Sequence, residues 1–143
     1  ARAVPGPILL AGHSAGGHLA LRMVCPDAAL PGDVAGRIAG VLALSPLADL
    51  APRIPLPMNA DLRLDAPEAR AESPACHPAP ACPVLVEVGT DERPAFLAQA
   101  LALADAWPAA QLTLAAHRHH FDVIDPLGDP ASPLLRRLLA LAA

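Results

Sequence analysis

Short, mostly apolar runs alternate along the chain with longer amphipathic segments. The runs occupy residues 7–12, 38–44 and 84–88, and a weaker run follows at 112–115. Continuous apolar runs of this length are typical of strands that are buried on both faces. The 84–88 run is also rich in β-branched valine, which favours a strand. The pattern therefore predicts four strands.

Amphipathic segments between the runs predict helices. Residues 15–25 carry small and apolar side chains, and Pro26 directly after them cannot continue a helix. Pro94 suits the first turn of a second helix. The face of this helix that we expect to be buried consists of Phe96, Ala100, Leu103 and Trp107, with Leu97, Leu101 and Ala104 beside it.

The last segment carries a helix-start signal at Ser132, a capping residue that is followed by Pro133. Its expected apolar stripe is formed by Leu134, Leu135, Leu138, Leu139 and Leu141, with Arg136 and Arg137 outside it. Strands that alternate with helices in this way predict an α/β fold, in which helices cover both faces of a mostly parallel sheet.

Residues 46–82 interrupt this alternation. They are rich in proline and alanine and show no strand period, and their clearest helix signal is at 66–72, with Asp65 as the cap. We interpret the segment as an ordered excursion over the sheet that forms one wall of a binding cleft. A surface loop without a role is the alternative.

Composition narrows the classes of protein to which this chain can belong. The chain has 143 residues, a net charge of −4 and 54% hydrophobic residues, which fits one domain with its own core. Mild acidity and scattered arginines argue against a nucleic-acid partner. Apolar stretches all fall short of the ~20 residues that span a bilayer, so we expect no membrane partner. The three cysteines cannot all pair and form no CxxC motif, which favours reduced thiols and a cytoplasmic location.

The motif Gly12-His13-Ser14-Ala15-Gly16 matches G-x-S-x-G and lies between a predicted strand and a predicted helix. A sharp turn there would lift the Ser14 hydroxyl clear of the sheet as a nucleophile, and small neighbouring residues would let the strand and helix backbones approach. The backbone N–H of Ala15, at the helix start, would bind a developing oxyanion. A plain turn is the alternative interpretation.

A serine nucleophile requires a base, and the chain has six histidines. His120 occupies the expected position, in the loop after the last strand. His117 and His119 lie beside it, but no cysteine or carboxylate supports them at zinc-site spacing, so we expect no metal. His13 and His18 flank Ser14, and we expect them to make local hydrogen bonds or to line the cleft.

The acid that orients the base should follow the third strand, where Asp91 and Glu92 are both available. Either carboxylate could hold the imidazole tautomer and stabilise the imidazolium. We expect the other to act as a capping charge for the helix that starts at Pro94. The residue types alone leave both candidates open.

These residues resemble the α/β-hydrolase superfamily and, within it, the bacterial arylformamidases (kynurenine formamidases). The resemblance rests on the elbow at residues 12–19, the acid loop and helix at 89–99, and the histidine motif at 120–124; residues 58–65 are also similar. It implies hydrolysis of an aryl formamide, such as N-formylkynurenine in tryptophan catabolism, without a cofactor and with a small molecule as the substrate. The register of the family favours Glu92 as the acid, although the usual residue is Asp.

One departure from the family pattern is large. The His-Gly-Gly segment that supplies further oxyanion donors lies upstream of the elbow in the family, and residues 1–143 lack it together with the early strands. We therefore expect the carboxyl-terminal part of a single α/β-hydrolase domain, with the 7–12 strand as a bare, aggregation-prone edge. Loss of one oxyanion donor typically costs ~10²–10³ in turnover. A broad-range carboxylesterase and an inactive truncated fragment are therefore the rival hypotheses.

Overall fold

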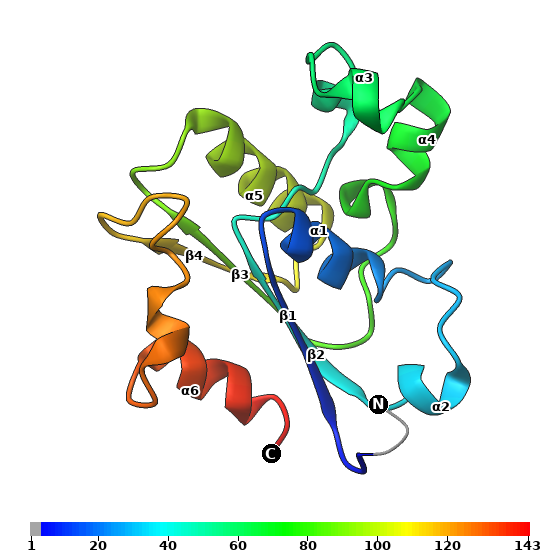
Figure 1. Cartoon of the computed structure of the whole chain (residues 1–143). Coiled ribbons are helices and arrows are strands. Elements are labelled where there is room, and N and C mark those ends of the chain that lie inside the picture. Colours follow the sequence, from blue (N-terminus) through cyan, green and yellow to red (C-terminus); the bar gives the residue numbers. More distant parts are fainter. Residues whose placement is uncertain (1–3) are drawn as a thin grey trace.

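The structure is a computed structural model and describes residues 4–143. Its centre is a parallel sheet of four strands in the spatial order β1-β2-β3-β4 (Figure 1). The strands are β1 (Ile8–His13), β2 (Ile38–Leu44), β3 (Val84–Gly89) and β4 (Gln111–Ala115). All four strands predicted from the sequence are present, with ends displaced by at most one residue.

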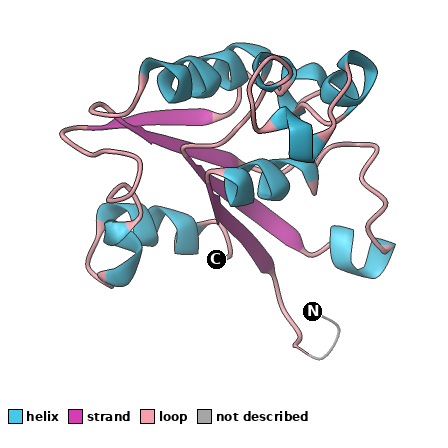
Figure 2. Ribbon diagram, turned by 45° about the horizontal axis from the view of Figure 1, so that its top comes forward, coloured by secondary structure: helices cyan, strands magenta, loops and turns pink. Residues whose placement is uncertain are grey.

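Helices cover both faces of the sheet, as the alternation of elements predicts. The helices are α1 (Ala15–Arg22), α2 (Gly32–Ala35), α3 (Asn59–Leu62), α4 (Ala66–Ala71), α5 (Pro94–Ala106) and α6 (Pro133–Ala140). Short 3-10 helices are η1 (Ala51–Arg53), η2 (Pro74–Cys76) and η3 (Asp125–Gly128). Figure 2 shows α1 and α5 on one side of the sheet and α6 on the other. None of the helices in the described part of the chain has both the length and the apolar character needed to cross a bilayer.

Helix ends follow local signals with one clear exception. Asp65 caps α4 by accepting a hydrogen bond from the Glu68 N–H (2.8 Å), and Ser132 caps α6 through the Leu135 N–H (3.1 Å). The first helix stops at Arg22, three residues earlier than we expected. The Val24 and Cys25 N–H groups bond to carbonyls only three residues back, which tightens the chain into turns before Pro26.

Two apolar layers hold the sheet between its helices. The layer under α1 and α5 includes Leu21, Val41, Val86, Val88, Leu103 and Trp107, and the layer under α6 consists of Leu42, Leu44, Leu85, Leu134 and Leu138. Trp107 is fully buried as expected, and its indole N–H donates to the His77 carbonyl (2.9 Å). Leu139, which we assigned to the apolar stripe of α6, is instead 57% exposed, and Leu101, beside the expected buried face of α5, is 56% exposed. Each follows a buried position by one residue, a rotation of about 100° that turns its side chain to solvent.

Residues 46–82 fold over the α1 side of the sheet and contain η1, α3, α4 and η2. Gln99 on α5 anchors their beginning, because its Oε1 accepts from the Ala48 and Asp49 N–H groups, both at 2.7 Å. Ser73 anchors their end by accepting from the Leu50 N–H (2.8 Å). The short helices α2 and α3 are not evident in the sequence pattern, because four residues are too few to show a periodicity. A role for this segment as a cleft wall stays a prediction.

Candidate active site

Ser14 occupies a sharp turn between β1 and α1. Its backbone lies in the left-handed region (φ 56°, ψ −119°), which is costly for a residue that carries a Cβ atom. Two hydrogen bonds hold this conformation: the Ser14 N–H donates to the Leu44 carbonyl (2.9 Å), and its own carbonyl accepts from the His18 N–H (3.0 Å). The turn predicted from the G-x-S-x-G motif is therefore present.

Close backbone approach at this turn explains two of its glycines. A Cβ atom on Gly12 would lie 2.0 Å from the Gly16 carbonyl oxygen, which no real contact allows. A Cβ atom on Gly17 would lie 3.2 Å from the Cα atom of Pro46. Gly16 differs, because a Cβ atom there would meet nothing within 4 Å. Steric fit therefore requires Gly12 and favours Gly17, but it does not require Gly16.

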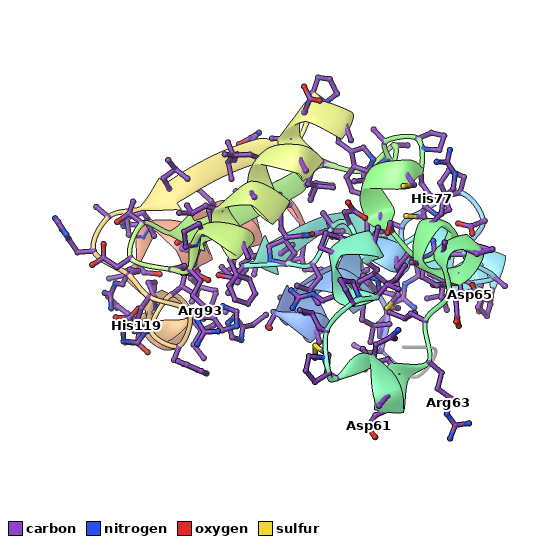
Figure 3. All side chains as sticks on the ribbon, turned by 90° about the horizontal axis from the view of Figure 1, so that it is seen from above. Asp61, Arg63, Asp65, His77, Arg93 and His119 are labelled. Atoms are coloured by element: carbon purple, nitrogen blue, oxygen red, sulfur yellow. The ribbon has the colours of Figure 1, made fainter. Side chains whose placement is uncertain are left out.

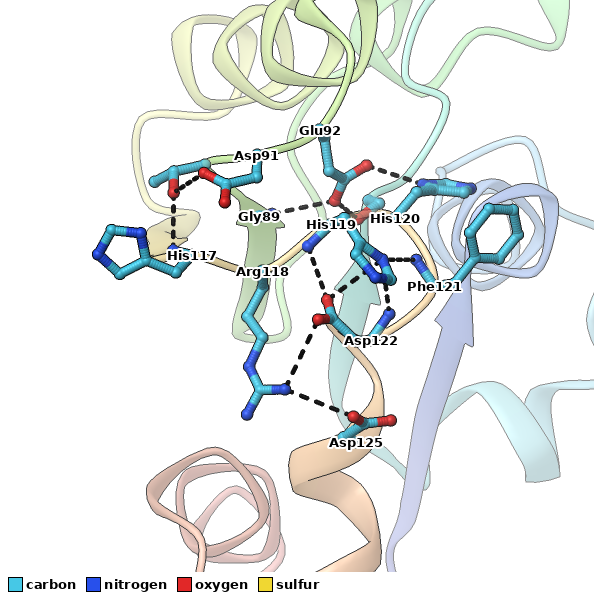
Figure 4. Close-up of polar contacts among 12 residues, drawn as sticks. Gly89, Asp91, Glu92, His117, Arg118, His119, His120, Phe121, Asp122 and Asp125 are labelled. Atoms are coloured by element: carbon cyan, nitrogen blue, oxygen red, sulfur yellow. Dashed lines mark hydrogen bonds and ion pairs between the residues drawn. The ribbon is translucent and has the colours of Figure 1, made fainter.

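His120 links the turn to the acid loop, although 106 residues separate it from Ser14. Its Nε2 lies 3.0 Å from the Ser14 hydroxyl, and its Nδ1 lies 2.8 Å from Glu92 Oε2 (the Glu92 contact is drawn in Figure 4). Because the carboxylate only accepts hydrogen bonds, Nδ1 carries the proton and Nε2 is free to accept from the hydroxyl. The three side chains thus form one continuous hydrogen-bond chain.

Glu92, and not Asp91, contacts the histidine. The Glu92 side chain is fully buried, and its Oε1 accepts from the Gly89 N–H (3.0 Å) and from the Ser45 hydroxyl. Asp91 is exposed, and its carboxylate accepts from the Thr90 hydroxyl (3.2 Å). Our expectation that the second acid caps the following helix is wrong, since the α5 cap position is Arg93 and has no side-chain capping bond.

Aromatic and histidine neighbours hold the His120 ring. Phe96 stacks on it with 4.0 Å between ring centroids, and Phe121 meets it edge-on at 5.4 Å. His13 Nε2 donates to the His120 carbonyl (2.7 Å), so His13 contacts the loop of the candidate base as well as flanking Ser14. A cavity of about 260 Å³ opens beside the ring and is lined by Arg93, Phe96, His120 and Phe121.

Sequence reasoning missed Ser45 and the stacking of Phe96 on His120. Ser45 directly follows β2, at the edge where the parallel strands end, and this position was the available signal. Phe96 was assigned to the core from its helical spacing, but it is only partly buried. Helix periodicity identifies the face that turns inward and not the residue that it meets.

Within residues 4–143, His18, His117 and His119 are not part of a cluster with metal-ligand geometry. His18 Nε2 donates to the Glu72 carbonyl (2.7 Å), and His119 Nδ1 accepts from the Phe121 N–H (3.1 Å). His117 points away from His120 at the outer end of the loop (Figure 4).

Cys25, Asp27 and His77 form the one cluster within residues 4–143 whose ligand atoms lie close enough for a metal. Arg22 occupies it already, because its guanidinium donates twice to Asp27, at 2.9 and 3.1 Å. Burial also raises the pKa of the Cys25 thiol, which disfavours the thiolate that a metal needs. These residues therefore do not fit a cation. Figure 3 places His77 on the opposite side of the molecule from Arg93 and His119, so the cluster is remote from the loop that carries His120.

Comparison with known proteins shows which solved structures have a similar fold. No family model matches the chain. A protein of Silicibacter sp. TM1040 described as a candidate thioesterase is 47% identical, with a TM-score of 0.92, and the match covers 97% of this chain and 53% of that one. Apo esterase 2 of Thermogutta terrifontis is 24% identical, with a TM-score of 0.61, over 94% of this chain and 53% of the esterase. Its propionate-bound form gives a TM-score of 0.60 at 24% identity, over 94% and 53% of the two chains.

The fold is of the α/β-hydrolase type. The chain spans about half the length of the solved structures that it matches. Both neighbours are described as proteins that act on esters or thioesters, and neither is described as an arylformamidase. At 24% identity, the esterase supports the fold alone.

Proposed function

We propose that this chain carries the nucleophile, the base and the acid of a serine hydrolase. The observation that carries the proposal is the unbroken chain from the Ser14 hydroxyl through His120 to Glu92, with links of 3.0 and 2.8 Å. Three residues from separate loops rarely meet in this order unless they act together. Hydrolase neighbours with the same fold support this assignment.

The geometry supports a two-step acyl transfer. Ser14 Oγ attacks the substrate carbonyl and gives its proton to His120 Nε2, while the carbonyl electron pair moves onto the oxygen. Ala15 begins α1, so its N–H has no acceptor within the helix and is free to donate to that oxyanion. His120 then protonates the leaving group as its bond to the carbonyl carbon breaks. Water, deprotonated by His120, cleaves the acyl-enzyme and restores the Ser14 hydroxyl.

Glu92 supports both steps without exchanging a proton. Its buried carboxylate accepts from Nδ1, which fixes the tautomer with a free Nε2 and stabilises the imidazolium after proton transfer. The Gly89 N–H and the Ser45 hydroxyl donate to the second carboxylate oxygen, so hydrogen bonds hold the buried group in a fixed orientation toward His120.

An aryl formamide such as N-formylkynurenine is the substrate that we propose. The sequence resemblance to arylformamidases motivates this choice, and the products would be formate and kynurenine. Phe96 and Phe121 beside His120 support an aromatic leaving group, because they provide apolar ring surfaces where that group departs.

A carboxylic ester or thioester is the second candidate, and the descriptions of the structural neighbours favour it. The same three residues would perform that reaction. A comparison of kcat/KM for N-formylkynurenine and phenyl acetate separates the two candidates. Preference for the acetate would replace the formamide as the proposed substrate.

Covalent labelling with a fluorophosphonate tests the shared mechanism, including the rival hypothesis of an inactive fragment. We expect one adduct per chain, mapped by mass spectrometry to Ser14 and lost in Ser14→Ala. His120→Asn should slow labelling about 10²-fold or more. His117→Asn is the matched control, because His117 is exposed and Asn tolerates its left-handed backbone (φ 58°). Labelling that persists in Ser14→Ala, or fails in the parent chain, contradicts the proposal.

A further inference from the structure

Two arginines from distant parts of the chain flank the Phe96 ring that stacks on His120. Arg93 lines the 260 Å³ cavity beside that ring. Arg53, at the end of η1, places its guanidinium carbon over the Phe96 ring, 6.0 Å from the centroid. The excursion of residues 46–82 and the residue before α5 thus each bring an arginine to the surroundings of Phe96.

Neither guanidinium forms an ion pair with a carboxylate among the described residues. Across residues 4–143, the ion pairs of arginine within 4.0 Å join Arg22 and Arg118 to carboxylates, and none involves Arg53 or Arg93. Arg53 Nε is buried, and no acceptor in the described part of the chain receives its hydrogen bond. A buried donor on a charged group is unfavourable when it is left without an acceptor.

The cavity lies where the leaving group of the substrate would be bound. His120 forms one of its walls, and in acyl transfer this ring protonates the group that departs. The four lining residues include two phenyl rings, one guanidinium and no carboxylate. An aromatic ring would pack against Phe96 and Phe121, and a guanidinium matches the planar oxygens of a carboxylate or phosphate.

We propose that Arg93 binds an anionic substituent, a carboxylate or a phosphate, on an aromatic leaving group of the substrate, and that Arg53 adds positive charge beside the Phe96 ring. This inference rests on the proposed function for the direction of the reaction. It assigns specificity-determining residues that lie outside the hydrogen-bond chain of Ser14, His120 and Glu92.

Binding to the 143-residue chain tests the anion site without any need for turnover. Titration calorimetry should show benzoate or phenyl phosphate binding about 10-fold or more tightly than benzamide, a neutral molecule of similar shape, at low salt. The stronger of the two anions identifies the substituent. Arg93→Gln should remove the preference, whereas Arg136→Gln, an exposed arginine on α6, should retain it. Equal binding of all three molecules overturns the proposal.

Arg53→Gln tests the second guanidinium and should also reduce the preference. Arg53→Lys, which keeps the charge but not the planar fork, should restore part of it. Because Arg53 is partly buried, its variants could be unstable, and the exposed Arg93 keeps the test decisive in that case.

Kinetics test the side of the substrate that carries the anion. We expect the ratio of kcat/KM for 3-acetoxybenzoate over its methyl ester to fall about 10-fold in Arg93→Gln and to be unchanged in Arg136→Gln. Phenyl hydrogen succinate carries its anion on the acyl group. If Arg93→Gln lowers the ratio of kcat/KM for this ester over phenyl acetate instead, the anion binds on the acyl side and the assignment is overturned. Anion binding without ester turnover would contradict the proposed function alone, and turnover without anion preference would contradict this inference alone.

Discussion

A difference of one position separates Glu92 from Asp91, yet their surroundings are opposite. Glu92 turns inward, where the Ser45 hydroxyl, the Gly89 N–H and His120 satisfy both of its oxygens. Asp91 lies at the surface with Thr90 as its side-chain partner. A carboxylate can be buried only where partners replace its lost hydration, and the loop provides such partners at position 92 alone.

Removing the Glu92 charge should therefore affect catalysis far more than removing that of Asp91. Glu92→Gln keeps the shape but favours the wrong His120 tautomer, and we expect kcat for an activated ester to fall by about 10⁴-fold. Asp91→Asn is the matched control and should change kcat by less than about threefold. Initial rates, with circular dichroism to verify folding, provide the measurement. Equal losses in the two variants would remove Glu92 from the proposed role.

Backbone strain also concentrates at the site. Ser14 and Ser45 both have positive φ, 56° and 45°, and they follow the adjacent strands β1 and β2. Ser14 aims its hydroxyl at His120, and Ser45 aims its hydroxyl at Glu92. Such conformations persist only where surrounding contacts enforce them, and they are common at functional sites.

The elements converge because parallel strands end at the same edge of a sheet. The loops after β1, β3 and β4 carry Ser14, Glu92 and His120 respectively. Ligand sites in open α/β sheets lie at this edge for the same geometric reason. The fold thus places side chains from remote segments within hydrogen-bond reach of one another.

Close packing of β1 against α1 is a property of these two elements, and the glycines of the turn allow it to be tested. Gly12→Ala forces a Cβ atom against the Gly16 carbonyl, so the free energy of unfolding should fall by about 2–4 kcal/mol. Gly16→Ala meets open space within α1 and should raise it by up to about 1 kcal/mol. Urea denaturation measures both. A Gly12→Ala variant as stable as the parent chain would contradict the packing described here.

At the scale of the whole molecule, the two apolar layers cover the faces of the sheet but leave its edges less protected from water. Among the described residues, β1 pairs with β2 alone, so its other edge carries unpaired backbone groups. Exposed edges of this kind promote association, and the aggregation expected from the sequence stays a prediction. On the α6 side, the sheet also contains a buried carboxylate, Glu87.

Stability of the whole chain should depend on pH through Glu87. Burial raises the pKa of this carboxyl above its ordinary value of 4.5, and Arg137 opposes the effect only in part. Folding therefore favours the protonated form, whose stabilising contribution is complete below pH 4.5 and is lost as pH rises through the raised folded-state pKa. Glu87→Gln should be more stable than the parent chain at pH 7 and similar to it near pH 4. Denaturation midpoints across this range test the expectation, and a constant difference would contradict it.

Prediction from the sequence succeeded where the signals were local. The runs at 38–44 and 84–88, the caps at Asp65 and Ser132, and the turn at Ser14 each depend on residues within a few positions. It was wrong for Leu139, because a helical stripe does not reveal how wide the contact with the sheet will be. The end of α1 was wrong because the last turns tighten before Pro26.

The sequence by itself determined the order of strands and helices, the strand–helix turn that carries Ser14, and the identity of its candidate base, His120. The elements and the turn follow from side-chain periodicity and backbone preference, which act over short stretches of chain, and His120 follows from its position after the last strand and from the family resemblance. Only the tertiary structure decided between Glu92 and Asp91, stacked Phe96 on His120 and brought Arg53 to the same ring. These choices depend on which residues remote in sequence remove water from a group and replace its hydrogen bonds, and only the packed fold specifies those neighbours.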